Sequence, residues 1–203
     1  MAATTFTHAD LAYIRANYLT LDQLCAGRGD SPASVRRLID AGLLPRPSYV
    51  LDDGSGMFPA DYFRLVDDCG GAAALRDHFT GRYRAAAAAE GISDAALKED
   101  SVAYLGGVYG ICLREVTPET IVRKRVLVAS LCQLLVLARP RSAEWRAALR
   151  AQVDELDTLE RAFAPDYDRS EVQERPPTRD LLIAAARERF PDLFVKGADA
   201  EAV

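Results

Sequence analysis

Lysine and histidine are scarce in this sequence: its 203 residues include three lysines and two histidines, His8 and His78. The H-E-x-x-H, P-loop, G-x-S-x-G and dinucleotide-binding motifs are all missing, which argues against the enzyme classes that depend on them. His78 is the best candidate for a catalytic general base, because the unperturbed pKa of imidazole lies close to neutrality. The competing interpretation is a histidine at the edge of a buried helix face.

Paired cysteines are missing as well. The four cysteines, Cys25, Cys69, Cys112 and Cys132, form no C-x-x-C pair. This pattern predicts small buried thiols in a reducing compartment rather than a zinc ribbon or a disulfide framework. Because no cluster of possible ligands has the spacing of an established metal site, we expect no metal and no other cofactor.

Long apolar runs are also absent. The longest run, residues 126–138, is interrupted by Ser130 and Gln133 and is shorter than the ~20 residues that span a bilayer. No basic stretch followed by an apolar one marks the N-terminus, so no signal peptide is visible. We therefore expect a soluble cytoplasmic protein with no membrane partner.

Acidic residues outnumber basic residues by 30 to 25, which gives a net charge of −5. This balance excludes a generally basic protein that coats nucleic acid or an anionic membrane through its overall field. Hydrophobic residues make up 49% of the chain and charged residues 27%, as in soluble globular proteins. The length fits one domain with a small appendage, or two small domains that share a core.

Capping signals predict a mainly α-helical fold with one small β-hairpin. In residues 10–70, the pairs Thr20/Gln23 and Ser31/Pro32 predict the starts of two short helices, and Gly42 predicts the end of the second. The hairpin is expected over residues 49–58, and a further helix over 59–68. The remaining predicted units are a helical bundle over 72–192, with helices at 72–90, 93–113, 118–138, 142–163 and 178–190, and a flexible tail over 193–203.

Residues 18–25, 31–45 and 57–65 together resemble the MerR-type DNA-binding domain, a winged helix-turn-helix. The resemblance implies that the helix over residues 31–41 enters the major groove and that the hairpin, or wing, contacts the DNA backbone. By residue matching, the DNA-contacting positions would be Ser34, Arg36 and Arg37 on the helix, with Arg46 and Tyr49 on the wing.

The charge of this first third argues against DNA binding. Residues 1–70 contain six arginines, no lysine and nine aspartates, which leaves a charge of −3. Phosphate contacts provide most of the affinity for DNA, and a module with a net negative charge repels the phosphates. A local positive face that contains Arg36, Arg37 and Arg46 is the alternative.

Residues 104–115 contain Gly106, Gly107 and Gly110 within an apolar helical stretch. Each glycine costs a helix roughly 1 kcal/mol relative to alanine, so something is expected to approach this backbone closely. One interpretation is a neighbouring helix. The other is a small organic ligand, and the residues that would bind it are Tyr104, Tyr109, Cys112 and Arg114.

Arg123, Lys124 and Arg125 are consecutive and therefore point about 100° apart on a helix. They cannot all line one site. We expect at least one of them to pair with a carboxylate inside the fold.

Beyond the first third, residues 104–113, 117–124, 153–160 and 167–180 resemble an uncharacterised bacterial family, mostly actinobacterial, whose members are described as natural-product biosynthesis proteins. The resemblance implies a setting in specialised metabolism but no reaction. The leading hypothesis is a pathway protein that binds a small-molecule intermediate in its helical bundle, with an enzymatic role left open. The alternatives are a MerR-like regulator of a biosynthetic gene cluster and a non-catalytic partner of a biosynthetic enzyme; a homodimer is also considered.

Overall fold

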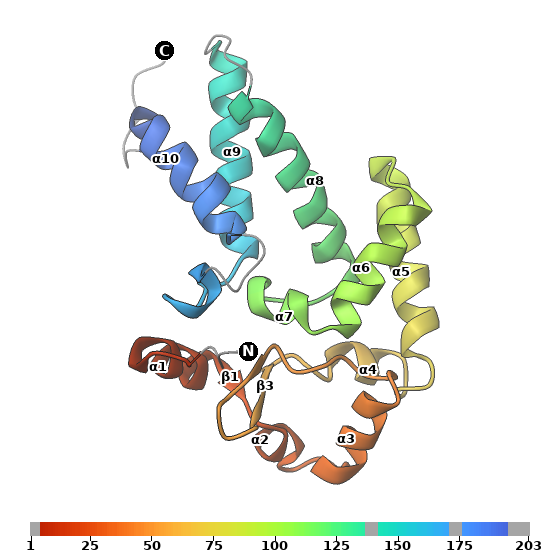
Figure 1. Ribbon diagram of the computed structural model, residues 1–203. Coiled ribbons are helices and arrows are strands. Elements are labelled where there is room, and N and C mark those ends of the chain that lie inside the picture. The colour runs from red at the N-terminus through yellow and green to blue at the C-terminus, as the bar shows by residue number, and fades with distance from the viewer. Residues whose placement is uncertain (1–4, 137–141, 171–175, 195–203) are drawn as a thin grey trace.

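The computed structural model describes residues 5–136, 142–170 and 176–194. Helices predominate, and one small sheet lies in the N-terminal third (Figure 1). The prediction of a mainly α-helical fold is therefore confirmed. Most of the predicted tail, residues 195–203, lies outside the described residues.

The N-terminal module, residues 8–68, alternates short helices with short strands. Its three strands form an antiparallel sheet in the order β1-β3-β2, with Tyr18 opposite Pro59 and Tyr49 opposite Met57. The predicted hairpin is formed by β2 and β3, whereas the pairing of β1 with β3 was not predicted. The elements are α1 (His8–Asn17), β1 (Tyr18–Leu19), α2 (Leu21–Cys25), α3 (Pro32–Asp40), β2 (Tyr49–Val50), β3 (Gly56–Pro59) and α4 (Arg64–Asp68).

Local capping contacts fix the helices of this module. Thr20 and Gln23 form a reciprocal capping box at the start of α2, and the Ser31 hydroxyl accepts a hydrogen bond from the Ser34 amide at the start of α3. Gly42, with a φ of +69°, follows α3 in the left-handed conformation. These three predictions are confirmed.

The helical region, residues 75–193, contains six α-helices of 5 to 19 residues among its described residues, together with short 3₁₀ turns and a π-helical stretch that leads into α10. The predicted helix over 93–113 is in fact two helices, because Gly107 has a φ of +80° and interrupts the chain between α6 and α7. The elements are α5 (Leu75–Glu90), α6 (Asp94–Leu105), α7 (Val108–Cys112), α8 (Pro118–Val136), α9 (Ala143–Leu159), a π-helical stretch (Arg179–Ala184) and α10 (Ala185–Arg189).

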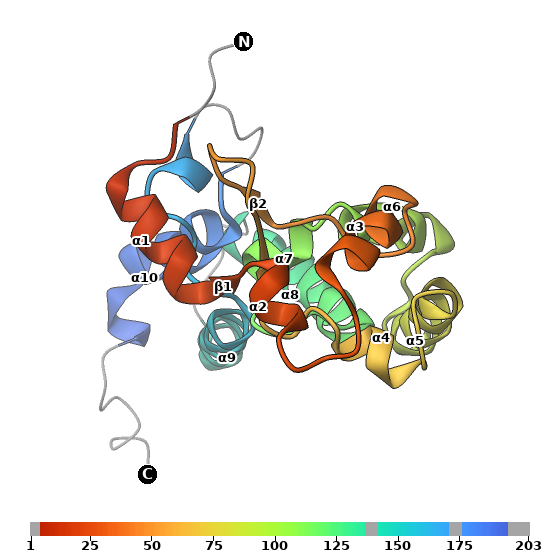
Figure 2. The same ribbon diagram turned by 90° about the horizontal axis from the view of Figure 1, so that it is seen from below.

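The largest apolar core crosses from the N-terminal module into the helical region. Val35 and Phe58 of the module belong to the same buried cluster as Phe79, Tyr83 and Ile121 of α5 and α8. Figure 2 views α8 and α9 nearly end-on and shows the N-terminal elements lying across their ends. The two parts therefore fold against each other rather than as separate bodies.

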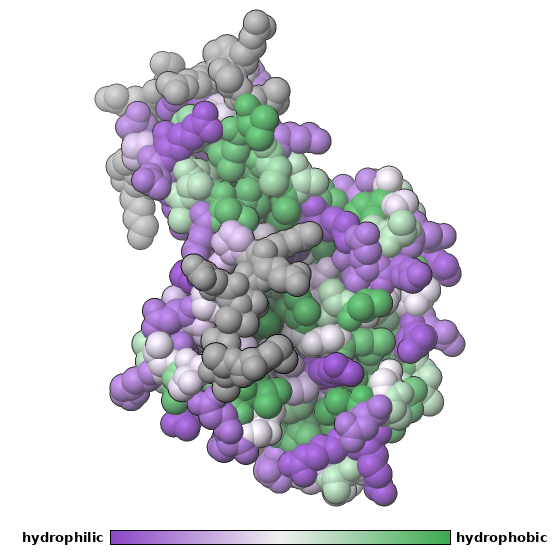
Figure 3. All heavy atoms as spheres, viewed as in Figure 1, coloured by the Kyte–Doolittle hydropathy of each residue, from purple (hydrophilic) through white to green (hydrophobic). Residues whose placement is uncertain are grey.

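A second core joins the C-terminal half of α8 to α9 and the last helical segment. Leu131, Leu149, Val153 and Ile183 are buried in it. These helices form an arm that diverges from α5 and α6 (Figure 1), and apolar side chains are exposed on its surface (Figure 3), among them Val136 at 81% exposure. Among the described residues, no helix combines the length and the apolar character needed to cross a membrane.

Candidate functional site

Two of the three glycines of residues 104–115, Gly107 and Gly110, lie under a loop of the N-terminal module. A Cβ on Gly107 would lie 2.7 Å from the carbonyl oxygen of Pro47, and a Cβ on Gly110 would overlap the Ser48 hydroxyl. Close packing against backbone atoms therefore requires glycine at position 107, and the side chains of Ser48 and Pro59 crowd Gly110. The neighbour is the loop before β2, which is neither the helix nor the ligand that the sequence suggested.

Hydrogen bonds hold this loop on the helical region. The Arg46 amide donates to the carbonyl oxygen of Leu105 (2.8 Å), the Ser48 hydroxyl to that of Gly107 (3.2 Å), and the Tyr18 hydroxyl to that of Gly110 (3.1 Å). These bonds fix the relative positions of the two parts of the protein.

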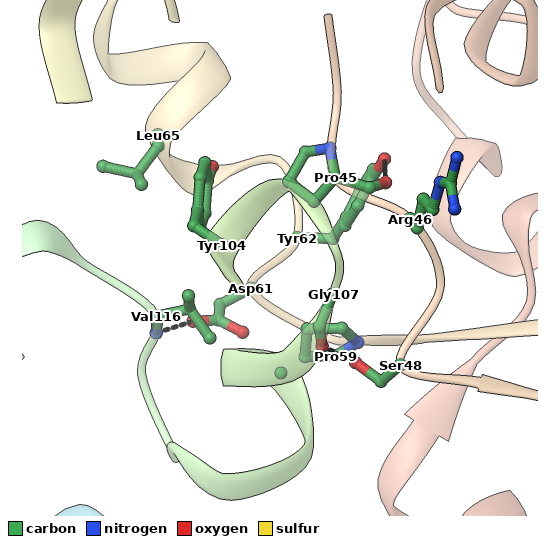
Figure 4. A pocket seen from close by; sticks show the side chains of 11 residues that line it. Pro45, Arg46, Ser48, Pro59, Asp61, Tyr62, Leu65, Tyr104, Gly107 and Val116 are labelled. Carbon is green, nitrogen blue, oxygen red and sulfur yellow. Dashed lines mark hydrogen bonds between the residues drawn. The ribbon is translucent and has the colours of Figure 1, made fainter. Parts of the chain in front are cut away.

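The cavity beside these glycines is too small for an organic ligand. It is lined by Tyr104, Asp61, Tyr62 and Ser48 among others (Figure 4), and its volume is about 20 Å³. A cavity needs roughly 10–15 Å³ on this measure to hold one water molecule, so about one water fits. The space against the glycine backbone is therefore smaller than the organic ligand that the sequence predicts there.

Tyr109 is used in a buried polar network instead. Its hydroxyl donates to Asp100 (2.6 Å), as does the Tyr83 hydroxyl (2.5 Å), and the Arg125 guanidinium donates to both oxygens of the same carboxylate (2.7 and 2.9 Å). Burial alone would raise the pKa of Asp100, but hydrogen bonds from Arg125, Tyr109 and Tyr83 outweigh burial and lower it. A carboxylate with four donors is saturated, so this network links α5, α6, α7 and α8 and leaves no acceptor for a ligand.

Cys112 is enclosed beside a second buried ion pair. The Lys124 ammonium lies 2.9 Å from Glu160 Oε1, which also accepts the Thr178 hydroxyl, and the Cys112 thiol interacts with the same ammonium. Burial raises the pKa of the Cys112 thiol and keeps it protonated. An inaccessible neutral thiol is not a ligand-binding group here.

All three residues of the basic cluster pair with different carboxylates: Arg123 with Glu155 (2.5 Å), Lys124 with Glu160 and Arg125 with Asp100. The prediction that at least one pairs inside the fold is confirmed.

The two other predicted site residues of the helical region lie apart from these networks. Arg114 is exposed. His78 is half-buried on α5, with Nε2 3.3 Å from an Arg82 nitrogen, and Arg82 itself binds Glu119 (2.9 Å). Within the described part of the chain, neither residue lines a cavity that Tyr104 also lines. The structure therefore does not bring His78 and Arg114 together with the other predicted ligand-binding residues.

Tyr104 does reach a larger cavity, which we call the interface cavity. It has a volume of about 250 Å³ and lies between the residues that follow α3, the start of α5 and the end of α6. Its apolar lining is formed by Gly42, Leu43, Ala72, Ala73, Leu75, Phe79, Tyr104 and Leu105, and its polar lining by Arg76, Asp77, Thr80 and Ser101. The Phe79 and Tyr104 rings stack on each other with centroids 4.6 Å apart, which makes this part of the wall rigid.

The sequence did not point to this cavity, because its walls come from segments about 60 residues apart. One local signal was available: Leu43 directly follows the helix-ending Gly42, and its side chain is 40% exposed at the edge of the cavity. An exposed leucine alone is common and would not have identified a site.

The positions that the MerR resemblance implied differ in their exposure. Arg36, Arg37 and Arg46 are exposed, and their side chains form no ion pair within the described residues. Ser34 is half-buried, and its hydroxyl donates to the Ser31 carbonyl oxygen (2.8 Å). Tyr49, expected on the wing surface, is instead 3% exposed and donates its hydroxyl to Asp168 (2.7 Å), so its side chain is directed into the core rather than to the surface of the wing.

A groove of about 430 Å³ separates α2 and α3 from the turn of the hairpin. Asp22, Asp40 and Asp53 line it together with a single arginine, Arg36. Three carboxylates against one guanidinium give this groove a negative balance, which repels phosphate.

All four cysteines are free thiols; Cys25 and Cys112 are buried, Cys69 is half-buried and Cys132 is exposed, so the expectation of burial is wrong for Cys132. Within the described residues, no group of three or more His, Cys, Asp or Glu side chains is placed to hold a metal ion.

Fold and cavities together define a mainly helical protein with a small three-stranded sheet near its N-terminus and an open apolar cavity between its two parts. The chain belongs to a family of unknown function, DUF6058, whose model matches residues 75–191. The match begins at the first residue of α5, so the N-terminal module precedes it. No curated protein matches the chain, and no solved structure matches it.

Proposed function

We propose that this protein binds a small organic molecule of specialised metabolism in the interface cavity. The observation that carries the proposal is the cavity itself: about 250 Å³, largely apolar and bordered by a few polar groups. Small-molecule sites have this character, although pockets for drug-sized ligands are larger, at roughly 300–1,000 Å³. The metabolic setting rests on the sequence resemblance to natural-product biosynthesis proteins.

Thermal unfolding in the presence of pathway intermediates tests the proposal. A ligand that binds only the folded state at 100 times its Kd stabilises it by about 2.7 kcal/mol. For a chain of this length, that corresponds to a rise in Tm of roughly 5–10 °C. Deletion of the gene followed by metabolite profiling identifies the intermediates to use, because a blocked step accumulates its substrate.

Two adjacent alanines provide a matched pair of variants. Ala73 lines the cavity, whereas Ala74 in the same turn does not, and both are exposed. Ala73→Phe is expected to fill the cavity and abolish the ligand-induced shift, and Ala74→Phe to preserve it. Equal shifts in the two variants would place the ligand elsewhere and refute this site.

A DNA-binding regulator is the second candidate. It is supported by the sequence resemblance to a winged helix-turn-helix, by the small antiparallel sheet that follows α3 in the chain, and by the exposure of Arg36 and Arg37 on α3. The acidic groove beside α3 makes it the weaker of the two. A regulator is expected to retard DNA from its own gene neighbourhood with salt-sensitive affinity, and Arg36→Ala combined with Arg37→Ala to abolish the retardation. Retardation that survives the double substitution would exclude this binding face.

A further inference from the structure

Two opposite charges stand side by side at the edge of the interface cavity. Arg76 and Asp77 are consecutive residues in the first turn of α5, both line the cavity, and both are exposed. Their side chains form no hydrogen bond or ion pair within the described residues. Most arginines of the neighbouring helices are engaged with carboxylates, as Arg82, Arg123 and Arg125 are, so Arg76 stands out as an uncommitted cation.

The interior of the cavity is apolar and limited in size. Leu43, Leu75 and Leu105 contribute aliphatic surface, and the stacked Phe79 and Tyr104 form one wall. About 250 Å³ suits a molecule with a short apolar chain or a single ring rather than a large natural product.

Two hydroxyl groups, from Thr80 and Ser101, line the same cavity. Ser101 donates its hydroxyl to the carbonyl oxygen of Leu97 (2.7 Å), which leaves its oxygen lone pairs able to accept a hydrogen bond. The Thr80 hydroxyl has no hydrogen-bond partner within the described residues. A ligand with both a donor and an acceptor at its polar end would therefore find partners for each.

We propose that the interface cavity binds a zwitterionic α-amino acid with an apolar side chain. The Arg76 guanidinium binds the carboxylate, the Asp77 carboxylate binds the ammonium group, and the side chain enters the apolar interior between Leu43 and Tyr104. A simple carboxylic acid would leave Asp77 unpaired and repelling, and a simple amine would leave Arg76 unpaired. This inference rests on the proposed function, since it assigns a chemical class to the ligand of the same cavity.

Four probes separate the contributions of the two charges: L-leucine, L-phenylalanine, 4-methylpentanoate, which lacks the amine of leucine, and 3-methylbutylamine, which lacks its carboxylate. We expect calorimetric titration of the full chain to give leucine or phenylalanine an affinity at least about tenfold above both analogues, because each loses one charge-assisted contact. Equal affinities for leucine and either analogue, or no binding of either amino acid, would overturn the inference.

Substitutions assign each charge to its partner. Arg76→Gln is expected to abolish the preference for leucine over the amine, and Asp77→Asn the preference for leucine over the acid. Arg84→Gln and Asp94→Asn are the matched controls, since these two exposed residues pair with each other at 3.5 Å and lie outside the interface cavity. Both controls should bind leucine as the unsubstituted protein does.

The outcomes for the ligand class and for the cavity are distinguishable. Pathway intermediates that stabilise the protein and lose this effect in Ala73→Phe, while amino acids do not bind, would refute the amino-acid inference and leave the proposed function intact. Leucine binding that persists unchanged in Ala73→Phe would place the amino acid outside the cavity and refute the amino-acid inference. Stabilisation by pathway intermediates that also persists in Ala73→Phe would refute the cavity as the site and with it the proposed function.

Discussion

Removal of the Arg125 side chain is the most direct test of the packing of the helical region. The Asp100 side chain is 4% exposed and depends on Arg125 for two of its four hydrogen bonds. In Arg125→Met, a side chain of similar length keeps the aliphatic contacts but removes both donors and the positive charge. The carboxylate then remains buried with two tyrosine hydroxyls alone.

The expected loss of stability follows from these contacts. Breaking a buried ion pair by removing one partner costs about 3–5 kcal/mol. Arg125 is 34% exposed, so water replaces part of its contribution, and we expect Arg125→Met to lower the free energy of unfolding by about 2–4 kcal/mol. In a chain of this length, that corresponds to a fall in Tm of roughly 5–15 °C.

The loss of stability in Arg125→Met should become smaller as the pH falls. The Asp100 pKa is lowered in the folded protein relative to its ordinary value of 3.8, so this group contributes stability above about pH 4 and loses it as the pH falls through the lowered pKa. The stability difference between the unsubstituted protein and Arg125→Met is therefore expected to be largest near neutral pH and to shrink below pH 4.

Urea unfolding followed by circular dichroism at several pH values measures these differences. Arg84→Met provides the matched control, because Arg84 pairs with Asp94 at 3.5 Å where both side chains are more than half exposed. Such a pair contributes about 0–1 kcal/mol. Equal losses in the two variants, or a difference that grows at low pH, would refute the buried-network account.

Substitutions at three further positions test other parts of the structure. Gly107→Ala is expected to destabilise the protein by several kcal/mol, since it combines a φ of +80° with overlap of the Arg46 carbonyl oxygen; an unchanged Tm would contradict the docking of the loop. Gly81→Ala, at an open position within α5, is expected to stabilise by about 0.5–1 kcal/mol. Burial raises the pKa of Asp168, so the contribution of this group to stability falls as the pH rises above about 4. Asp168→Asn keeps an acceptor oxygen for Tyr49 and the Ala164 amide, and its free energy of unfolding at pH 7 should stay within about 1 kcal/mol of that of the unsubstituted protein. Asp168→Ala removes the acceptor and should lose about 2–3 kcal/mol, as measured by chemical unfolding.

The sequence alone determined the features that depend on a few neighbouring residues. The capping box at Thr20, the Ser31-Pro32 start of α3 and the left-handed Gly42 are encoded within one helical turn, so they were predicted correctly. The crowding of glycines around Gly107 likewise indicated a close approach to the backbone before the neighbour was known.

Only the tertiary structure decided which side chains are free to act. Tyr104 and Tyr109 look equivalent in the sequence, but the Tyr109 hydroxyl is bonded to Asp100 whereas Tyr104 lines the interface cavity. That cavity joins Leu43 to α5 and α6, and the close approach to Gly107 comes from a loop about 60 residues earlier. Such contacts depend on how the whole chain packs, because neither periodicity nor capping carries information over that separation.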